Sequence, residues 1–194
     1  RDGTGEAIWP QLRSSVRTIE QYPHTLVLLA IAKLLRSTGN NVVLQMERGS
    51  GRVSDLRLHS ADRLINFEVK VPGDLLWEVD PLTPKEAGRH IPRLLKSGTR
   101  VDGQLPPPHS GILVIGGLHF SQRTRDLMQR AAEQHVGRPP SDYGHIMGVL
   151  FTWVHSWMTP AEGELIGNRL SLETHLFTAV RSEFVPNPGY RGND

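Results

Sequence analysis

The sequence predicts an α/β domain built on a central mixed β-sheet flanked by helices, with the element order αβββαβαβ. In residues 26–35, apolar side chains recur at three- and four-residue spacing, which is the period of a buried helix. Residues 64–71 instead alternate apolar and polar side chains, as a strand with one covered face does. Residues 111–117 form a short apolar run of the kind found in a strand covered on both faces.

The first half of the chain carries signals for a helix, three strands and a second helix. The first helix is expected to begin near Pro23 and to end at residues 37–40, where a Ser-Thr-Gly-Asn run supplies the stop. A second helix is expected from Thr83, which is a good cap, past Pro92 to Lys96. The three strands between the helices have short polar connectors, which favours an antiparallel meander over residues 41–47, 52–58 and 64–71.

The second half is expected to add two more strands and a helix. A proline-containing linker over 97–110 leads into the buried strand at 111–117. The helix that follows should have apolar residues on one side and arginines on the other. The expected elements are a helix at 121–135, a strand at 146–154, a strand or helix at 171–180, and a mobile Pro/Gly tail to residue 194.

Length and composition fit one globular domain over residues 1–194, with a core at 22–154 and a C-terminal extension at 155–194. The 38% apolar content is enough for a real core, and the lack of cysteine excludes disulfides and thiolate zinc sites. No apolar run approaches the ~20 residues of a membrane span, which predicts no membrane association and a cytoplasmic location. A secreted or delivered toxin domain stays open. Because the chain opens with Arg1, we expect a piece of a longer polypeptide with partner domains or subunits, and a homodimer stays open.

Three polar residues on two neighbouring predicted strands form the candidate site. Asp55 lies on the second strand, and Glu68 and Lys70 lie on the third, after twelve intervening residues. Glu68 and Lys70 share one face because side chains two apart on a strand point the same way. An antiparallel neighbour brings Asp55 beside them. Two carboxylates and an ammonium are therefore expected to converge.

This combination suits phosphodiester hydrolysis with a divalent cation. Mg²⁺ prefers oxygen ligands, and Asp55, Glu68 and the carbonyl of Val69 supply them, with Mn²⁺ as a substitute. The reaction needs an activated water, a Lewis acid and cover for developing negative charge. Lys70 is expected to orient the water or to steady that charge. The alternative is that these charges only mark the solvated face of a strand, and the surrounding order of elements favours the site.

With Asp55 followed by Glu68-Val69-Lys70, this region resembles the PD-(D/E)XK nuclease superfamily. The resemblance covers residues 22–154 in element order, and it implies a restriction-endonuclease-like core and a Mg²⁺-dependent endonuclease that cuts DNA. Ser54 stands where members often have proline. Many members also have an acidic residue on the first helix for a second metal, and only Glu20 or Glu6 offers one here. A two-metal mechanism is therefore in doubt, and a nuclease-like module that only binds nucleic acid or protein, or an RNase on the same fold, stays open.

Other features are compatible with nucleic acid without demanding it. The net charge is +2 and the isoelectric point is near 9.2, which permits binding. Arg123 and Arg125, near the start of the helix at 121–135, are weak candidates for phosphate contacts, and a solvated helix face explains them equally well. Core packing is the expected role of Trp153 and Trp157. No His-x-x-x-His pair, Gly-x-Ser-x-Gly elbow or P-loop occurs, which argues against zinc hydrolases, serine hydrolases and nucleotide binding.

Overall fold

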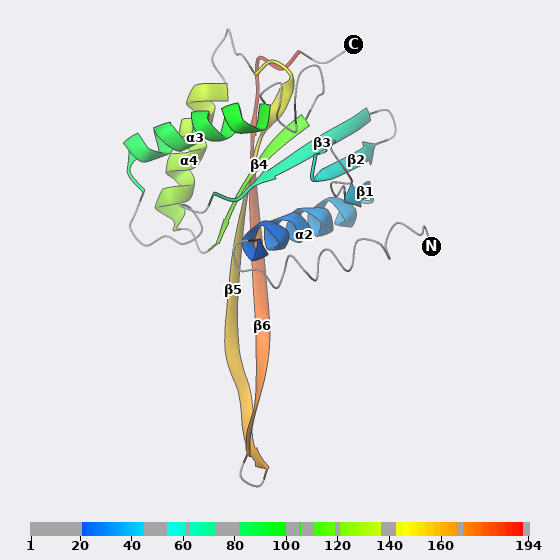
Figure 1. The fold of residues 1–194 in the computed structure, drawn as a ribbon, viewed down its shortest axis with the longest axis vertical. Helices are drawn as coiled ribbons and strands as arrows, with labels where there is room; N and C mark the ends of the chain where they lie inside the picture. The colour runs from blue at the N-terminus through cyan, green and yellow to red at the C-terminus, as the bar shows by residue number, and fades with distance from the viewer. Residues whose placement is uncertain are drawn as a thin grey trace.

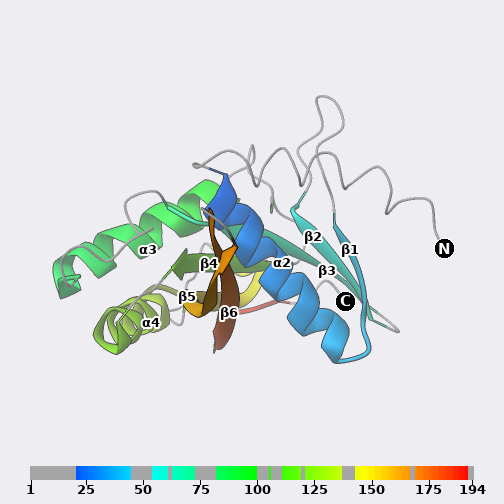
Figure 2. The ribbon, with the colours of Figure 1, turned by 90° about the horizontal axis from the view of Figure 1, so that it is seen from below.

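The computed structural model of the chain describes residues 21–44, 54–60, 63–72, 82–99, 105, 111–118, 121–136, 143–166 and 169–191, and for 60 and 156–179 only the backbone. Within these residues, six strands form one mixed sheet in the order β1-β2-β3-β4-β5-β6. Helix α2 lies against one face, and helices α3 and α4 lie against the other (Figures 1 and 2). The predicted α/β class with a mixed, helix-flanked sheet is confirmed.

The first four elements are a helix and an antiparallel meander, as predicted. Helix α2 has proline in its first turn and ends at Ser37, two residues before Gly39, whose φ of 82° belongs to the left-handed region that glycine adopts easily. The second strand begins four residues later than predicted, and residues 45–53 lie outside the described part. The elements are α2 (Tyr22–Ser37), β1 (Asn41–Leu44), β2 (Leu56–Ser60) and β3 (Arg63–Lys70).

Helix α3 (Pro84–Thr99) begins with the predicted cap. Glu86 N donates to Thr83 Oγ1 over 3.3 Å, and Thr83 N donates back to Glu86 Oε2 over 2.8 Å. This reciprocal pair satisfies two of the N–H groups that a helix start leaves open. The helix continues through Pro92 and includes residues 97–99, which were expected in the linker. Buried side chains on its last turns hold it to the sheet, among them Leu94 and Leu95.

The second half contains three strands and one helix, and the segment predicted as a strand or a helix at 171–180 is a strand. Strand β4 (Gly111–Leu118) is buried throughout and lies between β3 and β5, parallel to both. Helix α4 (Gln122–Val136) follows it. Strand β5 (Ile146–Ile166) continues twelve residues past its predicted end and pairs antiparallel with β6 (Arg169–Pro186). Together, β5 and β6 extend as a long two-stranded ribbon beyond the rest of the sheet (Figure 1).

The expected mobile tail is wrong as far as Arg191. Residues 181–186 belong to β6, and Asn187 lies buried behind them. Its side-chain amide donates to the carbonyls of Tyr143 and Ile146 over 2.9 and 2.8 Å, and Arg191 N donates to Gly144 O. These bonds fasten the end of the chain to the turn before β5. Residues 192–194 lie outside the described part.

Two apolar layers hold the helices to the sheet. On one face, α2 packs Val27 and Ile31 against β3 and β4; on the other, α3 and α4 pack against β4 and β5 around Trp153. Trp153 is 1% exposed and stacks on Phe151, which confirms its predicted core role. The side chain of Trp157 lies outside the described part. No helix within the described residues is long and apolar enough to cross a membrane.

The strand directions determine where polar groups gather. Because β3, β4 and β5 are parallel, their carboxyl ends lie at the same end of the sheet. In open α/β sheets, this is the end where ligands bind. Since β2 runs antiparallel to β3, the beginning of β2 lies there too.

Candidate active site

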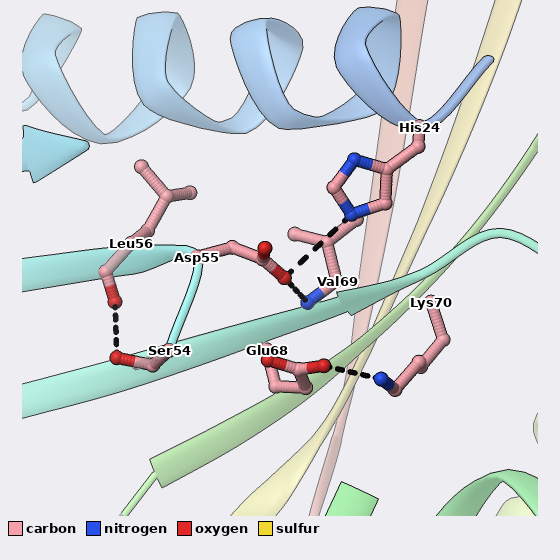
Figure 3. Close-up of polar contacts among 7 residues, drawn as sticks. All are labelled: His24, Ser54, Asp55, Leu56, Glu68, Val69 and Lys70. Atoms are coloured by element: carbon pink, nitrogen blue, oxygen red, sulfur yellow. Dashed lines mark hydrogen bonds and ion pairs between the residues drawn. The ribbon is translucent and has the colours of Figure 1, made fainter. Parts of the chain in front are cut away.

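Asp55 lies at a bend immediately before β2, not on the strand as predicted. Its Oδ2 accepts a hydrogen bond from Val69 N over 2.7 Å (Figure 3). The side chain thus takes the place of a ladder carbonyl at the point where strand pairing begins. The pairing of Leu56 with Phe67, continued by one residue, sets Asp55 opposite Glu68. The bend therefore keeps Asp55 beside the third strand, although it is not part of the second.

The bend before β2 is supported by buried polar groups. Ser54 is 4% exposed, and its hydroxyl lies within donating distance of Asn66 Oδ1, at 3.2 Å, and of Leu56 O, at 3.4 Å. Arg57 Nε also donates to Asn66 Oδ1, over 3.2 Å. Because Asn66 lies two residues before Glu68, this network ties the bend to the strand that carries the second carboxylate.

Glu68 and Lys70 come together as the alternation predicts. The ammonium of Lys70 forms an ion pair with Glu68 Oε1 (Figure 3). The Glu68 side chain is 1% exposed and faces α3, where a Cβ on Gly98 would lie 4.0 Å from its Cγ. Apart from the Lys70 ion pair, neither carboxylate oxygen accepts a hydrogen bond within the described residues. Such a buried, poorly satisfied carboxylate needs a proton or a cation.

The pKa of Glu68 also shows that its ionised form is unfavourable at this site. Burial raises the pKa of Glu68 from 4.5 to about 8, and the nearby Asp55 carboxylate adds to the rise through its charge. The protonated Glu68 carboxyl also hydrogen-bonds with the Asp55 side chain, which raises the pKa further, while Lys70 opposes the rise. The two carboxyl groups are therefore close enough to disfavour each other's charge.

His24 is a site residue that the sequence did not reveal. Its Nε2 lies 3.6 Å from Asp55 Oδ2, the oxygen that also accepts from Val69 N (Figure 3). It stands in the first turn of α2 with a half-exposed side chain. A search for paired histidines misses it, and its place on the first helix is the only signal in the sequence. Glu20 and Glu6, the proposed additional acids, lie outside the described residues.

The residues at the site fit a divalent cation held mainly by carboxylates. Within the described part of the chain, no group of three or more His, Cys, Asp or Glu side chains is arranged to hold a metal. Mg²⁺ nonetheless binds commonly through one or two carboxylates and several waters. Glu68, whose carboxylate oxygens are poorly satisfied, and the adjacent Asp55 provide two carboxylates. The N–H and C=O of a strand residue point to the same neighbour, which directs the Val69 carbonyl toward the Asp55 edge.

The two arginines proposed as phosphate contacts have different environments. Arg123 is exposed on the first turn of α4. Arg125 is 8% exposed and hydrogen-bonds to Gln122, which corrects its predicted place on the polar face of the helix. Arg125 lies three and seven residues before Met128 and Ala132, which are buried, so the helical spacing was a signal for its buried position that the prediction missed.

Comparison with known proteins gives no matching family model, no matching curated protein and no matching solved structure.

Proposed function

We propose that this domain is a restriction-endonuclease-like enzyme that hydrolyses phosphodiester bonds in DNA with Mg²⁺. The observation that carries the proposal is that Asp55 lies beside a buried Glu68 whose oxygens, among the residues that the structure describes, have no hydrogen-bond donor other than Lys70. Two adjacent carboxyl groups with a raised pKa are costly to ionise together unless a cation lies between them. The αβββαβ order of α2 to β4 and the position at the carboxyl end of β3 support the same assignment.

Each residue has a role that follows from its contacts. Asp55 and Glu68 would hold the ion, and the Val69 carbonyl would add a third ligand. When bound, Mg²⁺ supplies a Lewis acid and lowers the pKa of a water molecule. The Val69 N–H fixes Asp55 in place through the hydrogen bond to Oδ2. Lys70, paired with Glu68 at the rim, orients the attacking water or stabilises negative charge on the phosphate.

A plasmid-cleavage assay with Mg²⁺ or Mn²⁺ tests this proposal. Asp55→Asn and Lys70→Met should each reduce the cleavage rate by at least about 100-fold, the range typical of lost catalytic groups. Lys33→Met, an exposed lysine on α2, removes the same charge as Lys70→Met and should leave the rate unchanged. Undiminished cutting by Asp55→Asn or Lys70→Met would contradict the assigned site.

The alternatives are separated by substrate. Structured RNA that is cut faster than DNA would make the domain an RNase at the same site. If neither nucleic acid is cut with any divalent ion tested, the protein is a binding module on this fold. That outcome would agree with the lack of a third carboxylate near Glu68 among the described residues.

A further inference from the structure

Two arginine side chains meet at the beginning of α4. Arg125, from α4, donates through Nη2 to the side-chain oxygen of Gln122. Arg181, from β6, donates through Nη1 to the same oxygen over 3.3 Å. Since one neutral acceptor serves both donors, the two guanidinium groups lie close together around it.

The charge of Arg125 has no counter-charge in this cluster. The residue is 8% exposed, and its Nε is buried without a hydrogen-bond partner among the described residues. The nearby carboxylates have other contacts: Glu183 pairs with Arg181 Nε over 3.4 Å, and Asp126 accepts from Gln122 Nε2 over 2.6 Å. Within the described part of the chain, the one hydrogen bond of the Arg125 side chain goes to the neutral amide of Gln122. A buried charge in this condition is costly and calls for an anion.

We propose that Arg125 and Arg181 form a phosphate-binding site for the nucleic-acid backbone. The Gln122 oxygen stands where a phosphate oxygen would accept from both guanidinium groups. Gln122 is exposed, and the Arg181 side chain is 58% exposed, which leaves the site open to a ligand. Charge-assisted hydrogen bonds to phosphate are about twice as strong as bonds to a neutral acceptor. The positive end of α4 favours an anion at the same place.

The cluster lies on the same face and at the same end of the sheet as the candidate active site. Arg181 pairs with Trp153 of β5, and Trp153 pairs with Gly117 of β4. Lys70 pairs with Ile115, two residues before Gly117 on that strand. With strands about 4.8 Å apart and about 3.3 Å per residue, the backbones at Arg181 and Lys70 are separated by roughly 16 Å.

That separation suits one nucleic-acid strand in contact with both places. At about 3.4 Å of helix axis per phosphate on each strand, roughly four or five phosphates span it. Glu68 faces α3 and Arg181 contacts α4, and both helices cover the same face of the sheet (Figure 2). The identification of the phosphate as part of a nucleic acid rests on the proposed function. The uncompensated charge of Arg125 is independent of that function.

Binding without metal tests the site independently of catalysis. A labelled duplex of about 20 base pairs, and a single strand of equal length, would be titrated in EDTA at several salt concentrations and followed by fluorescence anisotropy. Arg181→Gln and Arg125→Gln should each weaken binding about three- to tenfold and lower the slope of log K against log salt by about one. Arg130→Gln, an exposed arginine on the same helix, is the matched control and should change binding less than about twofold.

Arg181→Gln and one further variant, Gln122→Glu, keep the test decisive if Arg125→Gln fails to fold. Arg181 is largely exposed, and its substitution should leave the fold intact. Gln122→Glu leaves both arginines in place and sets a carboxylate where the phosphate is expected, which should also weaken binding. If Arg181→Gln shows the same affinity and salt slope as the control Arg130→Gln, the proposed site is wrong. The same holds if the wild-type protein binds neither the duplex nor the single strand. DNA binding that depends on Arg181 without any cleavage supports the site and overturns only the proposed hydrolysis.

Discussion

Removing the charge of Glu68 should change how the stability of the metal-free protein depends on pH. The folded pKa of Glu68, about 8, lies above its ordinary value of 4.5 because the carboxyl is buried beside Asp55. The protonated Glu68 carboxyl favours the folded state, and this contribution is fully present below pH 4.5. It is lost as the pH rises through 8, because the carboxyl of the unfolded chain releases its proton at a lower pH than that of the folded protein. Between about pH 5 and about pH 8, this linkage lowers the free energy of unfolding by roughly 3 to 4 kcal/mol.

In Glu68→Gln, that loss should be absent. Urea denaturation in EDTA at a series of pH values gives the free energy of unfolding as a function of pH. The loss is measured as the difference between the slopes of wild type and variant. Glu86→Gln is a suitable control, because hydrogen bonds from Thr83 lower the pKa of the exposed Glu86 and move its titration out of this range. Millimolar Mg²⁺ at about pH 8 should restore stability to the wild type and not to Glu68→Gln, since a bound cation favours the ionised ligand. Equal pH slopes for wild type and Glu68→Gln would refute the reasoning.

Three further predictions concern the scaffold. Thr83→Ala removes the hydroxyl that accepts from Glu86 N and donates to Glu86 Oε2, and it should lower the free energy of unfolding by about 1 kcal/mol in urea denaturation; an unchanged midpoint would mean that the cap does not stabilise the fold. Asn187→Ala removes the side-chain donor to the Tyr143 and Ile146 carbonyls, of which Tyr143 O still accepts from Ile146 N, and it should cost about 1 to 3 kcal/mol; a cost near zero would mean that these bonds do not hold the end of the chain. Burial lowers the pKa of His145 below 6.5, against a smaller raising effect of its contact with the Leu105 carbonyl, which makes stability fall as pH drops below that value. In His145→Gln, stability should fall less steeply at acidic pH than in the wild type. An unchanged decrease would mean that another group titrates there.

The parts of the fold that the sequence predicted are those fixed by local patterns. Period and capping identify α2 and α3, and alternation identifies β3, because these signals come from residues a few positions apart. The full length of β5 and β6 has no such local signal, and the sequence left strand and helix open for residues 171–180. Glycines and prolines interrupt residues 159–167, and strand pairing across the two long arms overrides that local preference.

The candidate site divides in the same way. Glu68 and Lys70 were predicted to meet because they are two residues apart on one strand, and the structure pairs them. Asp55 meets them through a bend that the sequence did not indicate, where its side chain accepts the Val69 N–H. His24 arrives from a helix thirty-one residues before Asp55, and only the packing of α2 on the sheet brings it close.

The arginine cluster shows which part of such a site a local sequence pattern cannot predict. Arg125 and Arg181 are fifty-six residues apart and belong to a helix and a strand whose meeting depends on the β5–β6 pairing. On a helical wheel, Arg125 falls beside Met128 and Ala132, three and seven residues further on, so the helical period alone would have placed it on the buried side of α4; what it meets there becomes visible only once α4 lies against the sheet. The buried guanidinium of Arg125 lies against the neutral amide of Gln122, and this uncompensated charge can be recognised only from the three-dimensional structure. Because Lys70 and Arg181 lie on one face of the sheet, a nucleic-acid strand that contacts both must cross the carboxyl end of β4 and pass β5 near Trp153. For the proposed nuclease, the topology thus determines the path of the substrate strand across the sheet.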